Sequence, residues 1–341
     1  MSMQFGLFHT VQWPEGSRQV DVYNEAIREA VRADELGLHS VWLTEHHFTR
    51  HGLVSDSLNV LSHIAALTKN IRLGTAVAVL PFHSPLRLAE SAAIVDLLSG
   101  GRLDFGVGRG YQPVEFGGFG VDMAERAARF EESIELILKG WTTHHAFEHK
   151  GEFWQYGMVD PQPKPLQTPH PPIWVATDSA EGLRHCADRD WGVMFPQGRS
   201  LDVLEEQVGR YRQALDDVGK PWDSSKLLVA RGLFVADSDD EAWATAGKPY
   251  ISFLEMARGL GSKRGTGGPD NPFDTDSLQD SVVFGSPETC AATLRRIQDI
   301  GVDYVLFFIR YADLSHEHIM RSLDLFAAEV APGLTAQVVG A

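Results

Sequence analysis

Short apolar stretches alternate with longer segments of helical periodicity along most of the chain. The apolar stretches are rich in β-branched and aromatic residues, and most are continuous, which is typical of parallel strands buried on both faces. Eight such stretches predict strands at residues 3–9, 39–44, 71–79, 102–107, 172–176, 192–195, 227–235 and 304–309. The chain is therefore expected to be an α/β protein with a parallel sheet.

Helices are predicted between these strands, where apolar residues recur every three or four positions. Ser17 is interpreted as the cap of the first helix, which ends near Gly37, and further helices are predicted at 57–68, 85–98, 124–138 and 287–300. Eight strand–helix units favour a closed (β/α)8 TIM barrel over an open doubly wound sheet, which is the alternative fold. With no internal repeat and no shift in composition, residues 1–341 are expected to form one domain.

Two stretches depart from this alternation. Residues 160–172 hold six of the 17 prolines, which predicts a stiff, extended connector. Residues 259–281 are rich in glycine, serine, proline and aspartate and show almost no apolar periodicity. In a compact barrel, a loop of that length predicts either an active-site lid or a disordered segment.

Composition and charge exclude several classes of protein. Hydrophobic residues at 43% and charged residues at 22% indicate a globular chain with a large core. The net charge of −16 disfavours binding to nucleic acid or to an anionic membrane surface. Two cysteines cannot build a disulfide framework or a cysteine metal cluster, and they fit a reducing compartment. Because no apolar run reaches about 18 residues and no leader is evident, a cytoplasmic protein is expected.

The sharpest candidate chemistry lies after the second predicted strand, at Glu45, His46 and His47. Catalytic groups of a TIM barrel gather at the carboxyl ends of its strands, and strand alternation places at least one imidazole in the barrel mouth. Histidine, with an ordinary pKa of about 6.5, exchanges a proton near neutral pH. A purely structural histidine is an equal alternative. A metal site through His47 and His51 is disfavoured because no His-Glu-x-x-His motif is present.

Two other strand ends suggest anion binding. Residues 106–111 lack the dinucleotide fingerprint because Tyr111 occupies the third glycine position. The glycines let a ligand approach the backbone and Arg109 offers a guanidinium to an anion, although a tight turn with a surface arginine is equally compatible. Asp178 and Ser179 open the helix after the fifth strand, where they suit a phosphate cradle but by themselves are more typical of a helix cap. Arg109 and this helix start together would anchor a monophosphate.

Four ordered motifs resemble those of the bacterial-luciferase-like flavin monooxygenase family. The motifs are Glu45-His46-His47-Phe48, residues 74–81, residues 101–110 and residues 171–176, and the similarity continues through 286–303. The resemblance implies a (β/α)8 barrel that binds FMN, which a separate flavin reductase supplies in reduced form. It also implies that O2 adds to the reduced flavin and that the resulting peroxyflavin oxygenates a small organic substrate such as an aldehyde or ketone.

The same resemblance implies roles for residues at the second and third strands. His46 is similar to the family's catalytic histidine and His47 to its supporting neighbour, with Glu45 orienting both. Ala76 and Val77 resemble the segment, often containing a non-proline cis peptide, against which the flavin ring rests.

Other implied roles concern the phosphate and the lid. Arg109 and Ser179 resemble the phosphate ligands, with the backbone at Asp178 assisting, and residues 259–281 fall where luciferase-type subunits carry a mobile lid. Gly108 stands where the luciferase catalytic subunit has a reactive cysteine, which disfavours light emission as the output.

Three functions follow from the resemblance, with the FMN-dependent monooxygenase favoured. The alternatives are an oxidoreductase that uses coenzyme F420 and a non-catalytic flavin-binding subunit, which the histidine pair and the apparent lid disfavour. The resemblance also implies a homodimer formed through the helices after strands two and three. Aromatic residues near the strand ends favour a hydrophobic substrate, although such residues equally often serve packing alone; they are Trp13, Phe48, Phe82, Tyr111 and Phe195.

Overall fold

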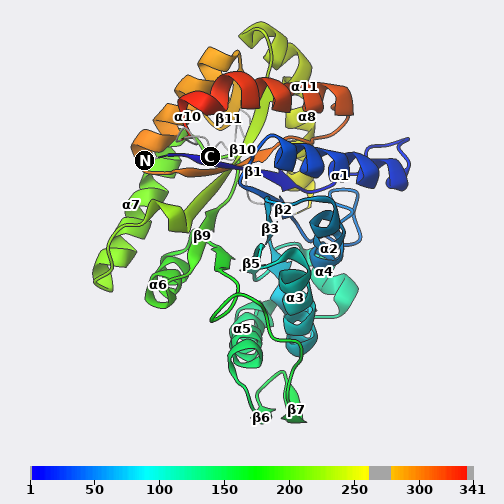
Figure 1. The fold of residues 1–341 in the computed structure, drawn as a ribbon, viewed down its shortest axis with the longest axis vertical. Helices are drawn as coiled ribbons and strands as arrows, with labels where there is room; N and C mark the ends of the chain where they lie inside the picture. The colour runs from blue at the N-terminus through cyan, green and yellow to red at the C-terminus, as the bar shows by residue number, and fades with distance from the viewer. Residues whose placement is uncertain (1, 261–277, 336–341) are drawn as a thin grey trace.

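Eight parallel strands close into a barrel in the computed structural model, which describes residues 2–260 and 278–335 (Figure 1). In barrel order they are β1 (Gln4–His9), β2 (Ser40–Leu43), β3 (Arg72–Thr75), β5 (Leu103–Gly108), β8 (Ile173–Ala176), β9 (Gly192–Phe195), β10 (Leu227–Val235) and β12 (Tyr304–Phe308). The ring is closed because β12 pairs with both β1 and β10, and β10 also pairs with β9. The predicted TIM barrel is confirmed, and the open sheet is ruled out.

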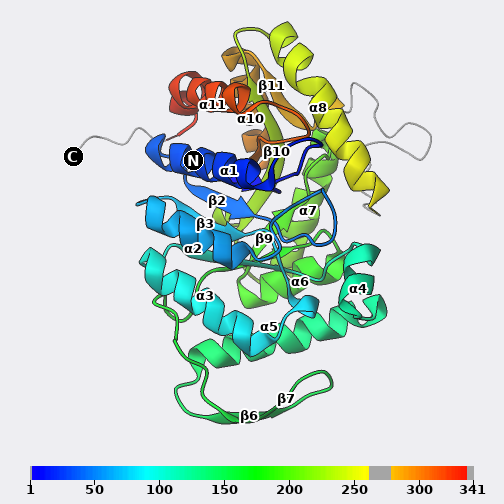
Figure 2. The same ribbon diagram turned by 90° about the vertical axis from the view of Figure 1, so that its right-hand side faces the viewer.

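Helices cover the outside of the barrel, and neighbouring ones lie side by side along one flank (Figure 2). The main ones are α1 (Gln19–Glu35), α2 (Ser57–Leu67), α3 (Pro85–Ser99), α5 (Arg126–Thr142), α6 (Ala180–Arg189), α7 (Leu201–Asp217), α8 (Asp239–Gly259), α10 (Pro287–Ile300) and α11 (His316–Leu325). The prediction of Ser17 as a helix cap is wrong. Arg18 is the N-cap of α1, and the Ser17 amide donates to the Pro14 carbonyl at 3.3 Å, so Ser17 belongs to the preceding turn.

The inside of the barrel is filled with side chains. Trp42 lies at its centre, where its indole nitrogen is 2.9 Å from the Ser40 hydroxyl and 3.1 Å from the Tyr304 hydroxyl. Gly74 must lack a side chain, because an added Cβ would come within 2.0 Å of the Trp42 ring. The other members of this inner cluster are Trp174, Met194, Leu228, Ala230 and Leu306. This packed layer leaves no space for a ligand among its own side chains, so the candidate site is sought at the end of the barrel where the strands finish.

The third predicted strand, 71–79, is interrupted at the barrel mouth. After Gly74 pairs with Asp104, the chain leaves β5 and pairs again as β4 (Ala78–Val79), with Ala78 opposite Val107. One more residue thus lies on this strand than on β5, which is a bulge next to the mouth. The bulge takes residues 76–77 out of the pairing with β5.

Several elements were not predicted. Among them are the hairpin β6 (Phe147–Lys150) and β7 (Gln155–Val159), which projects away from the barrel (Figure 1), the short helix α4 (Pro113–Phe119), and the strand β11 (Val282–Gly285), which pairs with the end of β10; the helices α7, α8 and α11 were given no bounds either. The proline-rich residues 160–172 connect β7 to β8 without a helix or a strand, and bends at 162, 166–169 and 171 interrupt the extended path that was predicted. The predicted lid at 259–281 falls mostly on 261–277, which lie outside the described residues.

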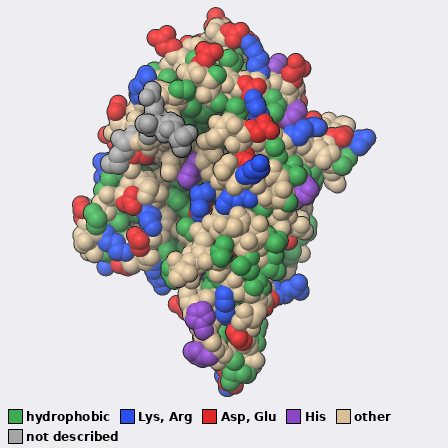
Figure 3. Space-filling model, in the orientation of Figure 1, with side chains coloured by type: hydrophobic (Ala, Val, Ile, Leu, Met, Phe, Trp, Pro, Cys, Tyr) green, Lys and Arg blue, Asp and Glu red, His purple; other side chains and the backbone are tan. Residues whose placement is uncertain are grey.

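On the face visible in Figure 3, acidic and basic side chains are interspersed with apolar ones. Among residues 2–260 and 278–335, no helix combines the length and the apolar character that crossing a membrane requires.

Candidate active site at the carboxyl ends of the strands

His46 follows β2 and lies buried at the mouth of the barrel. Its Nδ1 is 3.0 Å from Glu115 Oε1 and 3.0 Å from Gln112 Nε2. A single ring nitrogen either donates or accepts, and the charge-assisted bond to the carboxylate is stronger than a bond from an amide, so Nδ1 carries the proton and donates it to Glu115, while the Gln112 amide nitrogen, itself a donor, only contacts the ring. The same Glu115 oxygen accepts the His47 amide at 3.0 Å. The lone pair of the His46 ring is therefore on Nε2, as a general base requires.

Two buried polar atoms near this ring lack partners. Gln112 is fully buried, and its Oε1 finds no hydrogen-bond partner in the described part of the chain, nor does the Thr44 hydroxyl, two residues before His46. Buried polar groups are nearly always satisfied by protein, water or ligand. Such acceptors and donors at strand ends fit a site that binds a polar ligand.

Glu45 points away from His46 and binds different partners. Its carboxylate accepts from His47 Nε2 at 3.1 Å, from His83 Nε2 at 2.8 and 2.9 Å, and from the Val79 amide at 3.1 Å. The expectation that Glu45 orients both histidines is therefore wrong for His46. Successive residues at a strand end point in opposite directions, so Glu45 reaches only His47.

Burial and pairing act against each other in this cluster. Burial would raise the pKa of the Glu45 carboxyl, but hydrogen bonds from His47 and His83 outweigh it and lower that pKa below its ordinary value. Burial would likewise lower the pKa of His83, but the bond to Glu45 raises it. Both shifts favour the charged forms of the two groups.

Aromatic rings surround the outer side of His47. Its ring meets Phe119 at 4.6 Å and Phe82 at 5.9 Å between centroids. Phe48 is held at φ 61° with most of its ring exposed, and Gly118 makes room for it, because an added Cβ would lie 2.3 Å from that ring. This wall makes the rim of the mouth apolar beside the histidines.

Ala76 and Val77 form a half-buried apolar ledge on top of the inner cluster, and the peptide bond between them is cis. Gly108, at the end of β5, faces this ledge so closely that an added Cβ would lie 2.5 Å from Val77 Cγ2. A larger residue at 108 would therefore displace Val77. The ledge and the glycine therefore pack directly against each other at the mouth.

Arg109 is linked to helix α6, which begins after β8. Its Nη2 is 3.3 Å from Glu131 Oε1, and the same oxygen lies 3.5 Å from Nδ1 of His185 on α6. Ser179 is the N-cap of α6, where its hydroxyl accepts the Gly182 amide at 3.2 Å. The sequence allowed either a cap or a phosphate ligand at this serine, and capping is what the structure shows.

Asp178 is held by side chains from the next unit of the barrel. Its carboxylate lies 3.5 Å from Gln207 Nε2 and 3.8 Å from Arg199 Nη2. The backbone carbonyl of Asp178 is 3.5 Å from Arg210 Nη1. Basic side chains therefore gather where α6 begins, in a chain that is otherwise strongly acidic.

The end of α8 lies close to this site. The Phe253 ring stacks on His51 at 5.5 Å, and the His51 ring is 4.7 Å from that of His46. Gln12, after β1, has its Nε2 3.8 Å from the Met256 sulfur. The last turns of α8 therefore cover part of the mouth.

A metal centre is not formed by the residues described. Within 2–260 and 278–335, no group of three or more histidine, cysteine, aspartate or glutamate side chains is arranged to hold a metal ion.

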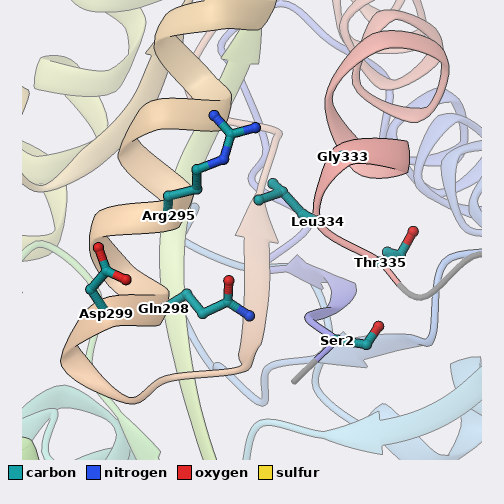
Figure 4. A pocket seen from close by; sticks show the side chains of 7 residues that line it. All are labelled: Ser2, Arg295, Gln298, Asp299, Gly333, Leu334 and Thr335. Atoms are coloured by element: carbon teal, nitrogen blue, oxygen red, sulfur yellow. The ribbon is translucent and has the colours of Figure 1, made fainter.

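A surface pocket lies at the opposite end of the barrel, where the strands begin (Figure 4). Its lining comes from Ser2, Arg295, Gln298, Asp299, Gly333, Leu334 and Thr335.

Sequence reasoning found the two histidines but missed most of their partners. Glu115 and Gln112 lie on or next to the unpredicted helix α4, and His83 follows the interrupted third strand. Their position in the sequence could have indicated them, because these residues also follow strand ends and therefore lie at the same mouth of the barrel.

Comparison with known proteins shows extensive similarity. A family model described as luciferase-like monooxygenase matches residues 3–304. The oxygenase component of a flavin-dependent trigonelline monooxygenase from Acinetobacter baylyi is 29% identical over an alignment of 356 positions. The alignment covers 99% of this chain and 97% of that protein.

Solved structures agree. A monooxygenase from Streptomyces bottropensis superposes with a TM-score of 0.88 at 27% identity, covering 97% of this chain and 99% of the other. The oxygenating constituent of 3,6-diketocamphane monooxygenase from Pseudomonas putida, a type II Baeyer-Villiger monooxygenase in complex with FMN, superposes at 0.85 with 22% identity, covering 98% and 99%. The latter shows a shared fold.

Proposed function

The chain belongs to the luciferase-like monooxygenase family, and from that premise we propose that it is a flavin-dependent monooxygenase that uses reduced FMN and O2 to oxygenate a small hydrophobic organic substrate. The observation that carries the proposal is His46, whose Nδ1 is fixed by Glu115 at 3.0 Å. This histidine lies at the strand ends that also bear the apolar ledge of Ala76 and Val77. The flavin-dependent relative supports the choice of cofactor.

The residues at the mouth fit a flavin. The ring would rest on Ala76 and Val77, where Gly108 leaves the surface clear. The phosphate would meet Arg109, the Ser179 hydroxyl and the backbone at Asp178, since the first amides of a helix favour an anion. Arg109 would then exchange Glu131 for the phosphate, a stronger bidentate partner. When bound, reduced FMN supplies the two electrons that let O2 transfer one oxygen atom to the substrate and release the other as water.

His46 supplies the proton chemistry in this proposal. With Nδ1–H donated to Glu115, Nε2 takes a proton from the substrate, and the carboxylate stabilises the imidazolium that results. Gln112 contacts the ring from a second side and limits its rotation. The aromatic wall and the end of α8 would reduce the access of water to the reacting groups.

Two partners complete the proposal. A separate flavin reductase supplies reduced FMN, as the term oxygenase component in the name of the Acinetobacter relative suggests. A second copy of the chain packs against α2 and α3, which expose large apolar side chains to solvent. These side chains are Leu67, Ile94, Leu97 and Leu98.

Replacement of His46 by alanine tests the function. His46→Ala should abolish product formation from reduced FMN, O2 and substrate while leaving reduced-FMN binding intact. His145→Ala, which removes an exposed histidine before the hairpin, is the matched control and should retain activity. Turnover by His46→Ala at the normal rate would refute the assignment, and turnover that needs coenzyme F420 and no oxygen would support the F420 alternative.

A further inference from the structure

The Glu45 carboxylate joins three separate segments of the chain. Glu45 itself follows β2, His83 precedes α3, and Val79 is the last residue of β4. One oxygen accepts from His47 and His83, and the other accepts from His83 and from the Val79 amide. All four contacts lie within 3.1 Å, and the carboxylate is almost wholly buried. Three donors therefore hold this carboxylate, and the His83 donor is shared between its two oxygens.

The contact to Val79 bears directly on the ledge. Val79 lies two residues after Val77, and β4 pairs with β5 only through Ala78 and Val79. Its amide would be a buried donor without a partner if Glu45 were removed or turned away. An unsatisfied buried amide is costly, so the loop between β3 and β4 would rearrange to satisfy it.

The carboxylate can keep this position only while it remains charged and paired. His83 is the partner that supplies a positive charge, and it does so from a side chain that is one-quarter exposed. The other titratable groups that act on the pair are His47, which donates to Glu45, and Asp56, the N-cap of α2, which favours the charged form of His83. Loss of the His83 charge would leave the buried Glu45 carboxylate with neutral donors only. The hydrogen bonds that keep the carboxylate in place would then be weaker.

We propose that Glu45 and His83 are positioning residues that hold segment 76–79 in the shape that binds the flavin ring. The proposal rests on the proposed function, since it takes the ligand of the ledge to be reduced FMN. Glu45 therefore does not act on the substrate or on the His46 ring. The family resemblance implies no role for His83. In this proposal its side chain determines the affinity for the flavin.

Two variants of His83 test the proposal in graded form. His83→Gln keeps a neutral donor at the place of Nε2, and His83→Ala removes the donor as well. Reduced-FMN affinity, measured by anaerobic titration, should fall about tenfold or more in His83→Ala and less in His83→Gln, because a charge-assisted bond is lost in both and the whole bond only in the first.

A second readout does not depend on the flavin. Backbone amide exchange in the peptide that contains residues 76–79, followed by mass spectrometry on the flavin-free protein, should become faster in both variants. The matched control is His316→Ala. His316 is also about one-quarter exposed and donates to a buried carboxylate, Glu29, at 2.8 Å, but it lies after β12 and away from the ledge. It should change neither flavin affinity nor exchange at 76–79.

The outcomes separate the two claims. Flavin affinity within twofold of wild type in His83→Ala, or an equal loss in His316→Ala, would overturn the positioning role. Unchanged exchange at 76–79 would overturn it as well. If the wild-type chain itself bound no reduced FMN, the flavin assignment would be refuted, and a faster exchange in His83→Ala would then show that the structural link exists without that ligand.

Discussion

Glu115 offers the most discriminating test of how His46 is set up for catalysis. Its Oε1 accepts from both His46 Nδ1 and the His47 amide, each at 3.0 Å. The His47 amide is only a donor, so a glutamine at 115 must keep its carbonyl oxygen at that position. Glu115→Gln therefore preserves the tautomer of His46 and removes only the charge. Glu115→Ala removes both the acceptor and the charge.

The magnitudes follow from this difference. A hydrogen bond to a charged group contributes about 1.5–3 kcal/mol, against about 1 kcal/mol for a neutral one, so Glu115→Gln should lower kcat about tenfold. Glu115→Ala frees the ring to take the wrong tautomer. The general-base contribution is then lost, and kcat should fall by about 10²- to 10⁴-fold. The affinity for reduced FMN should change in neither variant, since no proposed flavin contact involves Glu115.

The assay is single-turnover product formation after enzyme loaded with reduced FMN is mixed with O2 and substrate. Glu132→Gln is a matched control, because Glu132 also accepts from a histidine, His149 at 2.9 Å, and from backbone amides, but next to the β6–β7 hairpin. It should leave kcat unchanged. A wild-type kcat in Glu115→Ala would refute the role given to this carboxylate, and equal losses in Glu115→Gln and Glu115→Ala would refute the argument about the tautomer.

Three further predictions concern the flavin ledge, the phosphate and pH. Gly108→Ala places a methyl group 2.5 Å from Val77 Cγ2, and overpacking of about 1–3 kcal/mol should weaken reduced-FMN binding about tenfold or more in an anaerobic titration. Arg109→Gln should weaken FMN binding about tenfold to a hundredfold but leave the binding of riboflavin, which has no phosphate, unchanged; an equal loss for both would contradict a phosphate contact. The stabilisation from the Glu45–His83 pair should be complete between pH 4.5 and 6.5, the ordinary pKa values of the two groups, because the pKa of Glu45 is lowered and that of His83 is raised. Melting temperatures should therefore fall as pH rises through the raised pKa of His83 and as it drops through the lowered pKa of Glu45, and His83→Gln should abolish the alkaline fall.

The barrel could be predicted from sequence because its strands are buried on both faces and therefore appear as continuous apolar runs. The run at 304–309 and the run at 227–235 both form strands close to the expected bounds, β12 and β10. β11 escaped prediction because it has only four residues, Val282–Gly285, directly after a segment without apolar periodicity. The break between β3 and β4 also escaped, because the bulge depends on pairing with β5 and leaves the apolar run intact.

The site was only partly predictable for a similar reason. His46 and His47 are adjacent at a strand end, so the fold alone brings them to the mouth. Glu115 lies on a seven-residue helix that contains Gly117 and Gly118, which have low helix propensity, so no local signal places its side chain. That helix is fixed by tertiary contacts, and the separate partners of His46 and Glu45 become visible only when α4 is in place.

The central claim is that this chain binds reduced FMN and uses it to activate O2. The measurement that tests it most directly is anaerobic titration with reduced FMN followed by rapid mixing with oxygenated buffer, observed by absorbance. The account predicts saturable binding and a transient species whose spectrum differs from those of both reduced and oxidised FMN. Absence of binding, or direct return to oxidised FMN with no transient, would contradict it.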